Sequence, residues 1–176
     1  MPAFRRHLYK VKTKKTHNGP RVVRRRSNIH GSGVFARLPL AKGSKIIEYA
    51  GERISDKECE RRYPEYLDED NHTFIFELAK NVNIDGGSHG NTARWINHSC
   101  APNCETIEEN DKIYIVAVRA IRAGEELTYD YNMDAGEPLT PAVKRRWPCR
   151  CGAKKCRGTV LKPTRKPRKK KKSKRG

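Results

Sequence analysis

The sequence predicts a mainly β fold with minor α content. Short runs of β-branched and aromatic residues recur along the chain, and clusters of Gly, Asn, Asp and Pro separate them. One window has a helical composition. At 176 residues, the chain suits one folded unit with tails, and it is long enough to bury a core without disulfides. No internal repeat argues for a solenoid or an array.

The first strands are predicted in the N-terminal third of the chain. Val22 and Val23 begin a short strand after the turn at 18–20. Two glycines precede the apolar run that ends at Ala36, and a second run covers residues 45–52. Both runs are short and rich in β-branched or aromatic residues, which favours strands.

A helix and a hairpin are predicted next. The helix covers 56–66, with Asp56 after Ser55 as its start and Pro64 near its end. The hairpin joins strands at 73–78 and 82–85 through a turn at Lys80 and Asn81.

The second half of the chain continues the β pattern. A second strand pair is predicted at 104–107 and 112–118, with a turn at 109–111. The last apolar strand covers 127–131, and residues 132–148 form a Pro- and Gly-containing connector.

The positive charge of the chain is concentrated at its two ends. The net charge is +19, yet residues 27–161 hold 19 basic and 20 acidic residues. Residues 1–26 and 162–176 each hold ten Lys or Arg and no acid. The run at 166–175 is predicted to be a disordered polycation that binds nucleic acid by neutralising phosphates. A solubilising tail is the alternative interpretation.

No long apolar run predicts a transmembrane helix or a secretory signal, so an intracellular protein without membrane contact is expected. Six cysteines in a reducing compartment are more typical of metal ligands or buried thiols than of disulfides. Cys149, Cys151 and Cys156 lie on a short loop-rich segment and resemble three ligands of a tetrahedral zinc site. The fourth ligand is either Cys100 or Cys104.

The stretch from Arg94 to Cys104 has a dense set of polar, aromatic and thiol side chains, which predicts a binding site. The glycines at 31 and 33 allow a ligand to approach the backbone, but the loop lacks the third glycine of a dinucleotide site. Three tyrosines, Tyr49, Tyr129 and Tyr131, each lie on an apolar run beside an acid.

These motifs together resemble the SET-domain family of protein lysine methyltransferases. They follow the order of that family: His-Gly-Ser-Gly-Val-Phe at 30–35, Glu-Tyr-Ala-Gly-Glu at 48–52, Arg-Trp-Ile-Asn-His-Ser-Cys at 94–100, and Gly-Glu-Glu-Leu-Thr-Tyr-Asp-Tyr at 124–131. The Cys-x-Cys-x4-Cys segment resembles the family's post-SET zinc segment. The resemblance covers about 22–161.

The resemblance implies a β-clip-like fold of small sheets with a knot-like C-terminal crossing, an exception to the rule that chains do not thread. It implies a basic arm at 1–21, a SET domain at 22–132, a connector and post-SET zinc segment at 133–161, and a basic tail at 162–176. A monomer is expected.

The resemblance also implies S-adenosylmethionine as methyl donor and a protein lysine as acceptor. The residues assigned to the donor pocket are His30, Gly31, Ser32, Gly33, Phe74, Arg94, Trp95, Asn97 and His98. Those assigned to the lysine channel are Tyr49, Tyr129 and Tyr131, with Tyr131 orienting the amine. The zinc ligands are Cys100, Cys149, Cys151 and Cys156, and the resemblance favours Cys100 over Cys104.

Two positions distinguish this chain from many relatives. Phe74 stands where many relatives carry tyrosine, and the hydroxyl of Tyr129 is expected to favour mono- or dimethylation. The acids at 68–70 suit a basic, lysine-rich substrate such as a histone or a histone-like DNA-packaging protein, and a solvated acidic loop is the alternative interpretation. A nuclear or nucleoid location is expected if the basic tail acts as a nuclear localisation signal or as a nucleoid anchor, and composition does not separate these two.

A competing hypothesis is a catalytically silent, zinc-stabilised module that binds DNA or chromatin through its basic arms. It predicts salt-sensitive DNA binding and no methyl transfer.

Overall fold

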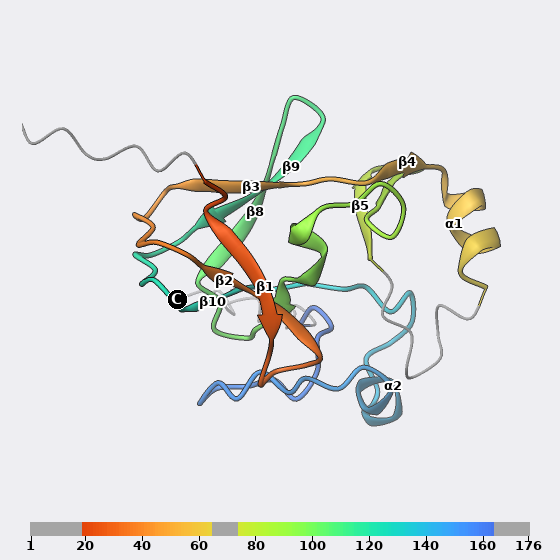
Figure 1. Cartoon of the computed structure of the whole chain (residues 1–176). Helices are drawn as coiled ribbons and strands as arrows, with labels where there is room; N and C mark the ends of the chain where they lie inside the picture. The colour runs from red at the N-terminus through yellow and green to blue at the C-terminus, as the bar shows by residue number, and fades with distance from the viewer. Residues whose placement is uncertain (1–18, 65–73, 164–176) are drawn as a thin grey trace, which may run out of the picture.

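The computed structural model describes residues 19–64 and 74–163. Small β sheets dominate it, with short helices at their margins, so the prediction of a mainly β fold with minor α content is confirmed (Figure 1). Most of the basic arm, the acidic triplet at 68–70 and the polycation at 166–175 lie outside the described residues. No helix in the described part of the chain is long and apolar enough to cross a membrane.

A four-stranded sheet collects strands from both ends of the folded region. Its order is β1–β2–β10–β7, where β1 is Val22–Arg26, β2 is Ser32–Ala36, β10 is Glu126–Tyr129 and β7 is Asn97–His98. The pairings β1–β2 and β2–β10 are antiparallel, and β10 pairs with β7 in parallel. The sequence did not reveal β7, because a two-residue strand has no periodicity of its own.

The second sheet has the order β3–β9–β8, where β3 is Lys45–Tyr49, β9 is Lys112–Ala117 and β8 is Cys104–Glu109. The β8–β9 hairpin forms where it was predicted. Asn110 and Asp111 both have positive φ angles of 53° and 57°, which Asn and Asp tolerate better than most residues.

The third sheet has the order β4–β6–β5, where β4 is Glu52–Ile54, β6 is Val82–Asp85 and β5 is Ile75–Ala79. The apolar run at 45–52 was predicted as one strand, but it divides between β3 and β4. A Cβ atom at Gly51 would lie 2.4 Å from the carbonyl oxygen of Asp85, so the close approach of β6 requires a glycine at this division.

The predicted helix is α1, Asp56–Arg62, and it begins as expected. The Ser55 side chain accepts a hydrogen bond from the backbone N–H of Glu58 and caps the first turn. The helix ends before Tyr66, the predicted end, because Pro64 disfavours helical angles at Tyr63, whose φ and ψ are −129° and 60°.

Two further helical segments escaped the sequence analysis. The predicted connector contains α2, Pro141–Arg146, with Thr140 as N-cap and a proline at the first helical position. A 3₁₀ helix, η1, covers Thr92–Trp95 and leads directly into β7. Both are shorter than the windows in which helical periodicity is readable.

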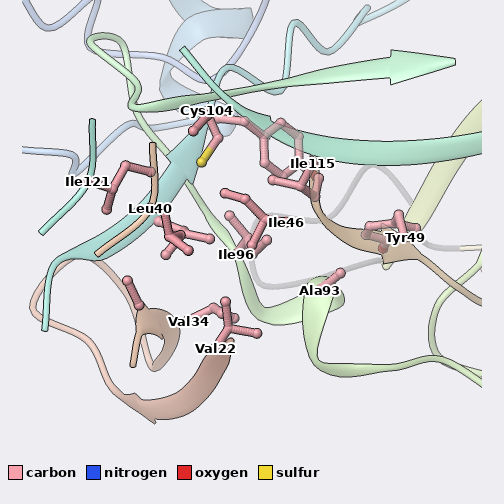
Figure 2. Packing of buried hydrophobic residues seen from close by; sticks show 14 of the residues in the cluster. Val22, Val34, Leu40, Ile46, Tyr49, Ala93, Ile96, Cys104, Ile115 and Ile121 are labelled. Carbon is pink, nitrogen blue, oxygen red and sulfur yellow. The ribbon is translucent and has the colours of Figure 1, made fainter. Parts of the chain in front are cut away.

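The core lies between the sheets and reaches the segment that carries β7. Figure 2 shows Val34, Ile96, Ile115 and Ile121 packed within it, and all four are at most 1% exposed. Because Ile96 is fully buried, it anchors the chain immediately before Asn97.

Asp85 joins α1 to the third sheet and is 1% exposed. It accepts hydrogen bonds from Arg62 at 2.9 Å, the Tyr63 hydroxyl at 2.9 Å and the Gly87 backbone N–H at 2.8 Å. Asp85→Ala removes all three hydrogen bonds, and we expect the free energy of unfolding to fall by about 3 kcal/mol.

Urea unfolding measures this loss, with Glu105→Ala on the exposed face of β8 as the matched control. The control should change stability by less than about 0.5 kcal/mol. An equal effect of the two substitutions would show that the Asp85 network contributes nothing.

Candidate active site

The segment from η1 to Cys100 forms the centre of the candidate site. Asn91 caps η1, since its side chain accepts from the Ala93 backbone N–H at 3.0 Å and donates to the Glu48 carbonyl at 2.8 Å. Ala93 and Ile96 are buried in the core. These anchors fix the backbone that presents Arg94, Trp95, Asn97 and His98.

Cations and aromatic rings surround Trp95. The Phe74 ring meets Trp95 edge-on with centroids 4.8 Å apart, and the Arg24 guanidinium lies 3.8 Å from the centre of the Trp95 ring. Arg24 also donates to the Ser32 hydroxyl at 2.9 Å. These contacts join β1 and the start of β2 to η1 and Phe74, which are distant in the sequence.

Arg94 extends the same group. It donates from Nη1 to the Gly86 carbonyl at 2.9 Å and lies 5.4 Å and 5.1 Å from the Phe74 and Trp95 ring centres. Its Nε is buried and has no hydrogen-bond partner among the described residues. A buried donor without a partner is costly, so this atom is available to a ligand acceptor.

Asn97 links the glycine loop to β10. Its Nδ2 donates to the Ser32 carbonyl at 2.9 Å, the Glu126 carboxylate at 2.9 Å and the His30 carbonyl at 3.3 Å. A Cβ atom at Gly33 would lie 2.2 Å from Glu126 Oε1, so this carboxylate requires a glycine beside it. Glu126 was not among the predicted site residues, although its carboxylate also accepts a hydrogen bond from the Ser27 hydroxyl at 2.7 Å.

His98 is buried and lies between the end of β10 and the cysteines. Its Nδ1 accepts a hydrogen bond from the Tyr131 backbone N–H at 3.1 Å, and its Nε2 lies 3.4 Å from Cys100 Sγ. Burial lowers the pKa of His98 to about 4. The ring is therefore neutral at pH 7, and these contacts assign its proton to Nε2, facing the sulfur.

The three predicted tyrosines come together with one further ring. Tyr49 and Phe76 have centroids 5.4 Å apart, Phe76 and Tyr129 are 6.4 Å apart, and Tyr129 and Tyr131 are 5.0 Å apart. Phe76 lies on β5 and was read only as a strand residue. The spacing of Phe74 and Phe76, two residues apart, puts both rings on one face of the predicted strand and could have indicated a shared site. Because both faces of a strand can be apolar, this spacing alone did not identify Phe76 as a site residue.

Two tyrosine hydroxyls are fixed by backbone carbonyls. Tyr131 donates to the Ile96 carbonyl at 2.9 Å, and Tyr49 donates to the Phe74 carbonyl at 2.7 Å. Burial raises the pKa of Tyr49, Tyr129 and Tyr131 above the ordinary value of a phenol. All three remain protonated at neutral pH, which suits hydrogen bonding and not proton abstraction.

The cysteines form a cluster next to His98. The sulfurs of Cys100, Cys149, Cys151 and Cys156 all lie within 4.8 Å of one another. Cys100 Sγ is 3.7 Å from Cys149 Sγ and 3.9 Å from Cys156 Sγ. A tetrahedral zinc ion with Zn–S bonds of about 2.3 Å requires sulfurs about 3.8 Å apart, so this donor set fits zinc.

Cys104 does not join that cluster. It is fully buried in β8, and burial raises the pKa of its thiol to about 12. The four sulfurs that lie within 4.8 Å of one another include that of Cys100 and not that of Cys104, so the geometry leaves Cys100 as the fourth member.

The structure thus brings the predicted residues into three adjacent groups. His30 and Gly31 lie exposed on the loop before β2, beside the buried pair Asn97 and His98. The tyrosines lie on one side of that pair and the cysteines on the other. The arrangement places a polar group, a set of aromatic rings and a cysteine cluster that could hold a metal around a single segment.

Comparisons with known proteins agree with this geometry. The SET-domain profile matches residues 31–132. The chain is 40% identical over 134 residues to the histone-lysine N-methyltransferase ash1 of Drosophila melanogaster, which covers 74% of this chain and 6% of that protein. It is 39% identical over 160 residues to the H3 lysine-4 specific histone-lysine N-methyltransferase of Schizosaccharomyces pombe. That match covers 88% of this chain and 16% of that protein.

A human relative, histone-lysine N-methyltransferase 2D, is 40% identical over 136 residues, which is 75% of this chain and 2% of that protein. The chain therefore spans only a small part of each of these relatives. The family profile, in contrast, covers more than half of the chain and all four motifs except the first residue of the first one. The chain belongs to the SET-domain family.

Proposed function

We propose that the chain is an S-adenosylmethionine-dependent protein-lysine N-methyltransferase that acts on a basic, histone or histone-like protein. The observation that carries the proposal is the parallel pairing of β7 with β10, which sets Asn97 opposite Thr128 and His98 opposite Tyr129, while the Tyr131 N–H donates to the His98 ring. The donor-pocket group and the aromatic channel thereby share one boundary. Relatives named histone-lysine N-methyltransferases support the same reaction.

The residues around Trp95 fit the donor. Two aromatic rings suit a flat base, and the buried Arg94 Nε offers an unused hydrogen-bond donor. The exposed loop at His30 and Gly31 offers backbone atoms at the edge of the same group. When bound, S-adenosylmethionine would supply a methyl group carried on its sulfonium sulfur. After transfer of the methyl group to the lysine nitrogen, the remainder of the donor is a neutral thioether.

The acceptor lysine must enter the channel and lose its proton. A free lysine has a pKa of about 10.4, so almost all of it is charged at neutral pH. The rings of Tyr49, Phe76 and Tyr129 exclude water, and this desolvation lowers the pKa of an enclosed amine. The channel therefore favours the neutral nucleophile, and the displaced proton leaves to solvent before methyl transfer.

Tyr131 would orient that amine. Its hydroxyl proton is committed to the Ile96 carbonyl, so its oxygen presents lone pairs to the N–H bonds of the neutral amine. Most of the rate then comes from alignment of nitrogen, methyl carbon and sulfur.

The four cysteines are proposed to bind one structural zinc ion. Backbone N–H groups of Arg157 and Gly158 point to the sulfurs of Cys100 and Cys156 at 3.4 Å and 3.3 Å. Such contacts stabilise thiolates, the form in which cysteine ligates zinc.

The proposed substrate follows from charge. Residues 27–132 hold 12 basic and 18 acidic residues, so the catalytic region favours a lysine-rich partner. A location at chromatin accords with the names of the relatives. Labelled donor incubated with core histones and, separately, with a bacterial histone-like protein tests the proposal. Label on either protein is expected, and its absence from both would reject the proposed activity.

The DNA-binding module remains the second candidate because of one observation. Residues 133–163 hold eight basic and two acidic residues, opposite in balance to the catalytic region. Salt-sensitive DNA binding without any methyl transfer would favour this candidate. DNA binding together with transfer would instead indicate that the basic segments deliver the enzyme to substrates on nucleic acid.

Tyr129→Phe is expected to raise the proportion of di- and trimethylated product. The Tyr129 hydroxyl lies in a buried channel beside Tyr131, and its removal leaves room for added methyl groups. Mass spectrometry of a methylated peptide measures the distribution. Tyr114→Phe in β9 is the matched control, since it removes a hydroxyl on a different sheet. Predominant trimethyl-lysine from the unaltered protein would contradict the idea.

A further inference from the structure

One ion pair joins the cysteine-rich segment to the residues that carry the channel tyrosines. Arg157 donates from Nη1 to Asp130 Oδ2 at 2.6 Å and from Nη2 to Asp130 Oδ1 at 2.7 Å. Each side chain is 23% exposed. Two parallel N–H···O bonds fix the orientation of both partners as well as their distance.

Asp130 holds the backbone on both sides of Tyr131. Its carboxylate also accepts from the Asn132 backbone N–H at 3.1 Å, so the side chain of residue 130 reaches across to residue 132. Asn132 has a positive φ of 48°, which shows how tightly the chain turns here. Tyr131 therefore lies within a turn that the Asp130 carboxylate closes.

Arg157 contacts the cysteine cluster with its backbone. It directly follows Cys156, and its N–H points to Cys100 Sγ at 3.4 Å. The same residue therefore touches the cluster through its main chain and the tyrosine turn through its side chain. Arg157 thus joins the cluster to the turn, as does the His98 ring, which contacts Cys100 and Tyr131.

Tyr131 is fixed from its other side by the η1–β7 segment. Its backbone N–H donates to His98 Nδ1, and its hydroxyl donates to the Ile96 carbonyl. These two bonds hold the phenol in place only if the turn from Asp130 to Asn132 keeps its shape. The Asp130–Arg157 ion pair fixes that turn against the cysteine-rich segment.

We propose that Asp130 and Arg157 are positioning residues that set the place of the Tyr131 hydroxyl in the channel. This inference rests on the proposed function. The pair touches neither donor nor acceptor, and it acts through the turn that carries Tyr131. A shift of the hydroxyl misaligns the acceptor nitrogen, and small misplacements cost large factors in rate.

Asp130→Asn, Arg157→Ala and the double variant test the pair. We expect each single substitution to lower kcat about tenfold, with the KM for peptide changed less than threefold. The double variant should be no slower than the worse single variant, because the two residues act as one unit. Zinc content should match that of the unaltered protein.

A second ion pair provides the matched control. Lys162 and Asp134 also join the C-terminal segment to the chain after β10, but their side chains are 53% and 65% exposed. Asp134→Asn and Lys162→Ala should leave kcat within twofold. Comparable losses in both pairs would mean that the whole C-terminal segment matters and that Asp130 has no special role.

Amide hydrogen exchange at Tyr131 measures positioning without any reaction. We expect faster exchange of this N–H in Asp130→Asn, because the turn that holds it loosens. Unchanged exchange, or a kcat within twofold, overturns the proposal. If Arg157→Ala loses its metal, Asp130→Asn decides alone. If the unaltered protein transfers no methyl group, the proposed function fails, and the exchange measurement still tests the pair.

Discussion

Replacing Tyr131 with phenylalanine is expected to lower kcat for methyl transfer by about 100-fold or more, while the protein remains folded. The substitution removes the hydroxyl that donates to the Ile96 carbonyl and that would orient the amine. It keeps the ring that packs against Tyr129 and His98. The loss should therefore fall on alignment of the reacting atoms and not on the shape of the channel.

Single-turnover rates with a histone peptide measure this effect, and thermal unfolding checks the fold. Tyr114→Phe should leave the rate within twofold. A Tyr131→Phe protein with at least half of the normal kcat would rule out an orienting role for this hydroxyl.

The pH dependence follows from the same tyrosine. Burial raises the pKa of Tyr131 above about 10, so its proton remains between pH 7 and 9. The acceptor lysine loses its proton over that range. The rate should therefore rise with pH up to 9, without a falling limb from the phenol.

Because the four cysteines are proposed to bind zinc, removing that metal, by chelation or by Cys149→Ser, is expected to weaken donor binding at least tenfold and to loosen residues 149–161. Cys100 belongs to the four-sulfur cluster, and its sulfur lies 3.4 Å from the His98 ring. Without a metal, the four sulfurs have no common partner to hold them together. His98 would then lose its contact with a fixed Cys100 sulfur, and the position of its neighbour Asn97 would be less well held.

Calorimetric titration with the donor measures the donor affinity, and limited proteolysis measures the loosening of residues 149–161. Cys59→Ser provides the control, because Cys59 lies in α1 and outside the cluster. Equal donor affinity with and without metal would refute the coupling, even if proteolysis still showed a looser C-terminal segment.

The sequence predicted best those elements whose signals are local. Ser55 caps α1 with its own side chain, and the Asn110–Asp111 turn closes a hairpin between neighbouring strands. Both depend on residues a few positions apart, so composition is enough to find them. The helix end at Arg62 was misplaced because the effect of Pro64 on Tyr63 was underestimated.

The sequence predicted least well what distant segments impose on one another. The last strand was expected to reach Tyr131, but β10 ends at Tyr129 because the Tyr131 N–H bonds to the His98 ring. Spacing alone could not separate Cys100 from Cys104; the family resemblance favoured Cys100, and the fold places the Cys100 sulfur in the cluster. Glu126 was missed because its partners, Ser27 and Asn97, come from two other parts of the chain.

The order of strands in the first sheet also bears on how the protein is made. β2 gains its inner partner only when β10, near the end of the folded region, has been synthesised. Until then, the β1–β2 hairpin exposes an unpaired edge that can pair wrongly or aggregate. Closing such a long loop is slow, so we expect folding to be limited by the arrival of β10. On the ribosome, the β1–β2 hairpin would emerge before β10 and would wait for the intervening residues 37–125 to be synthesised before its sheet is complete.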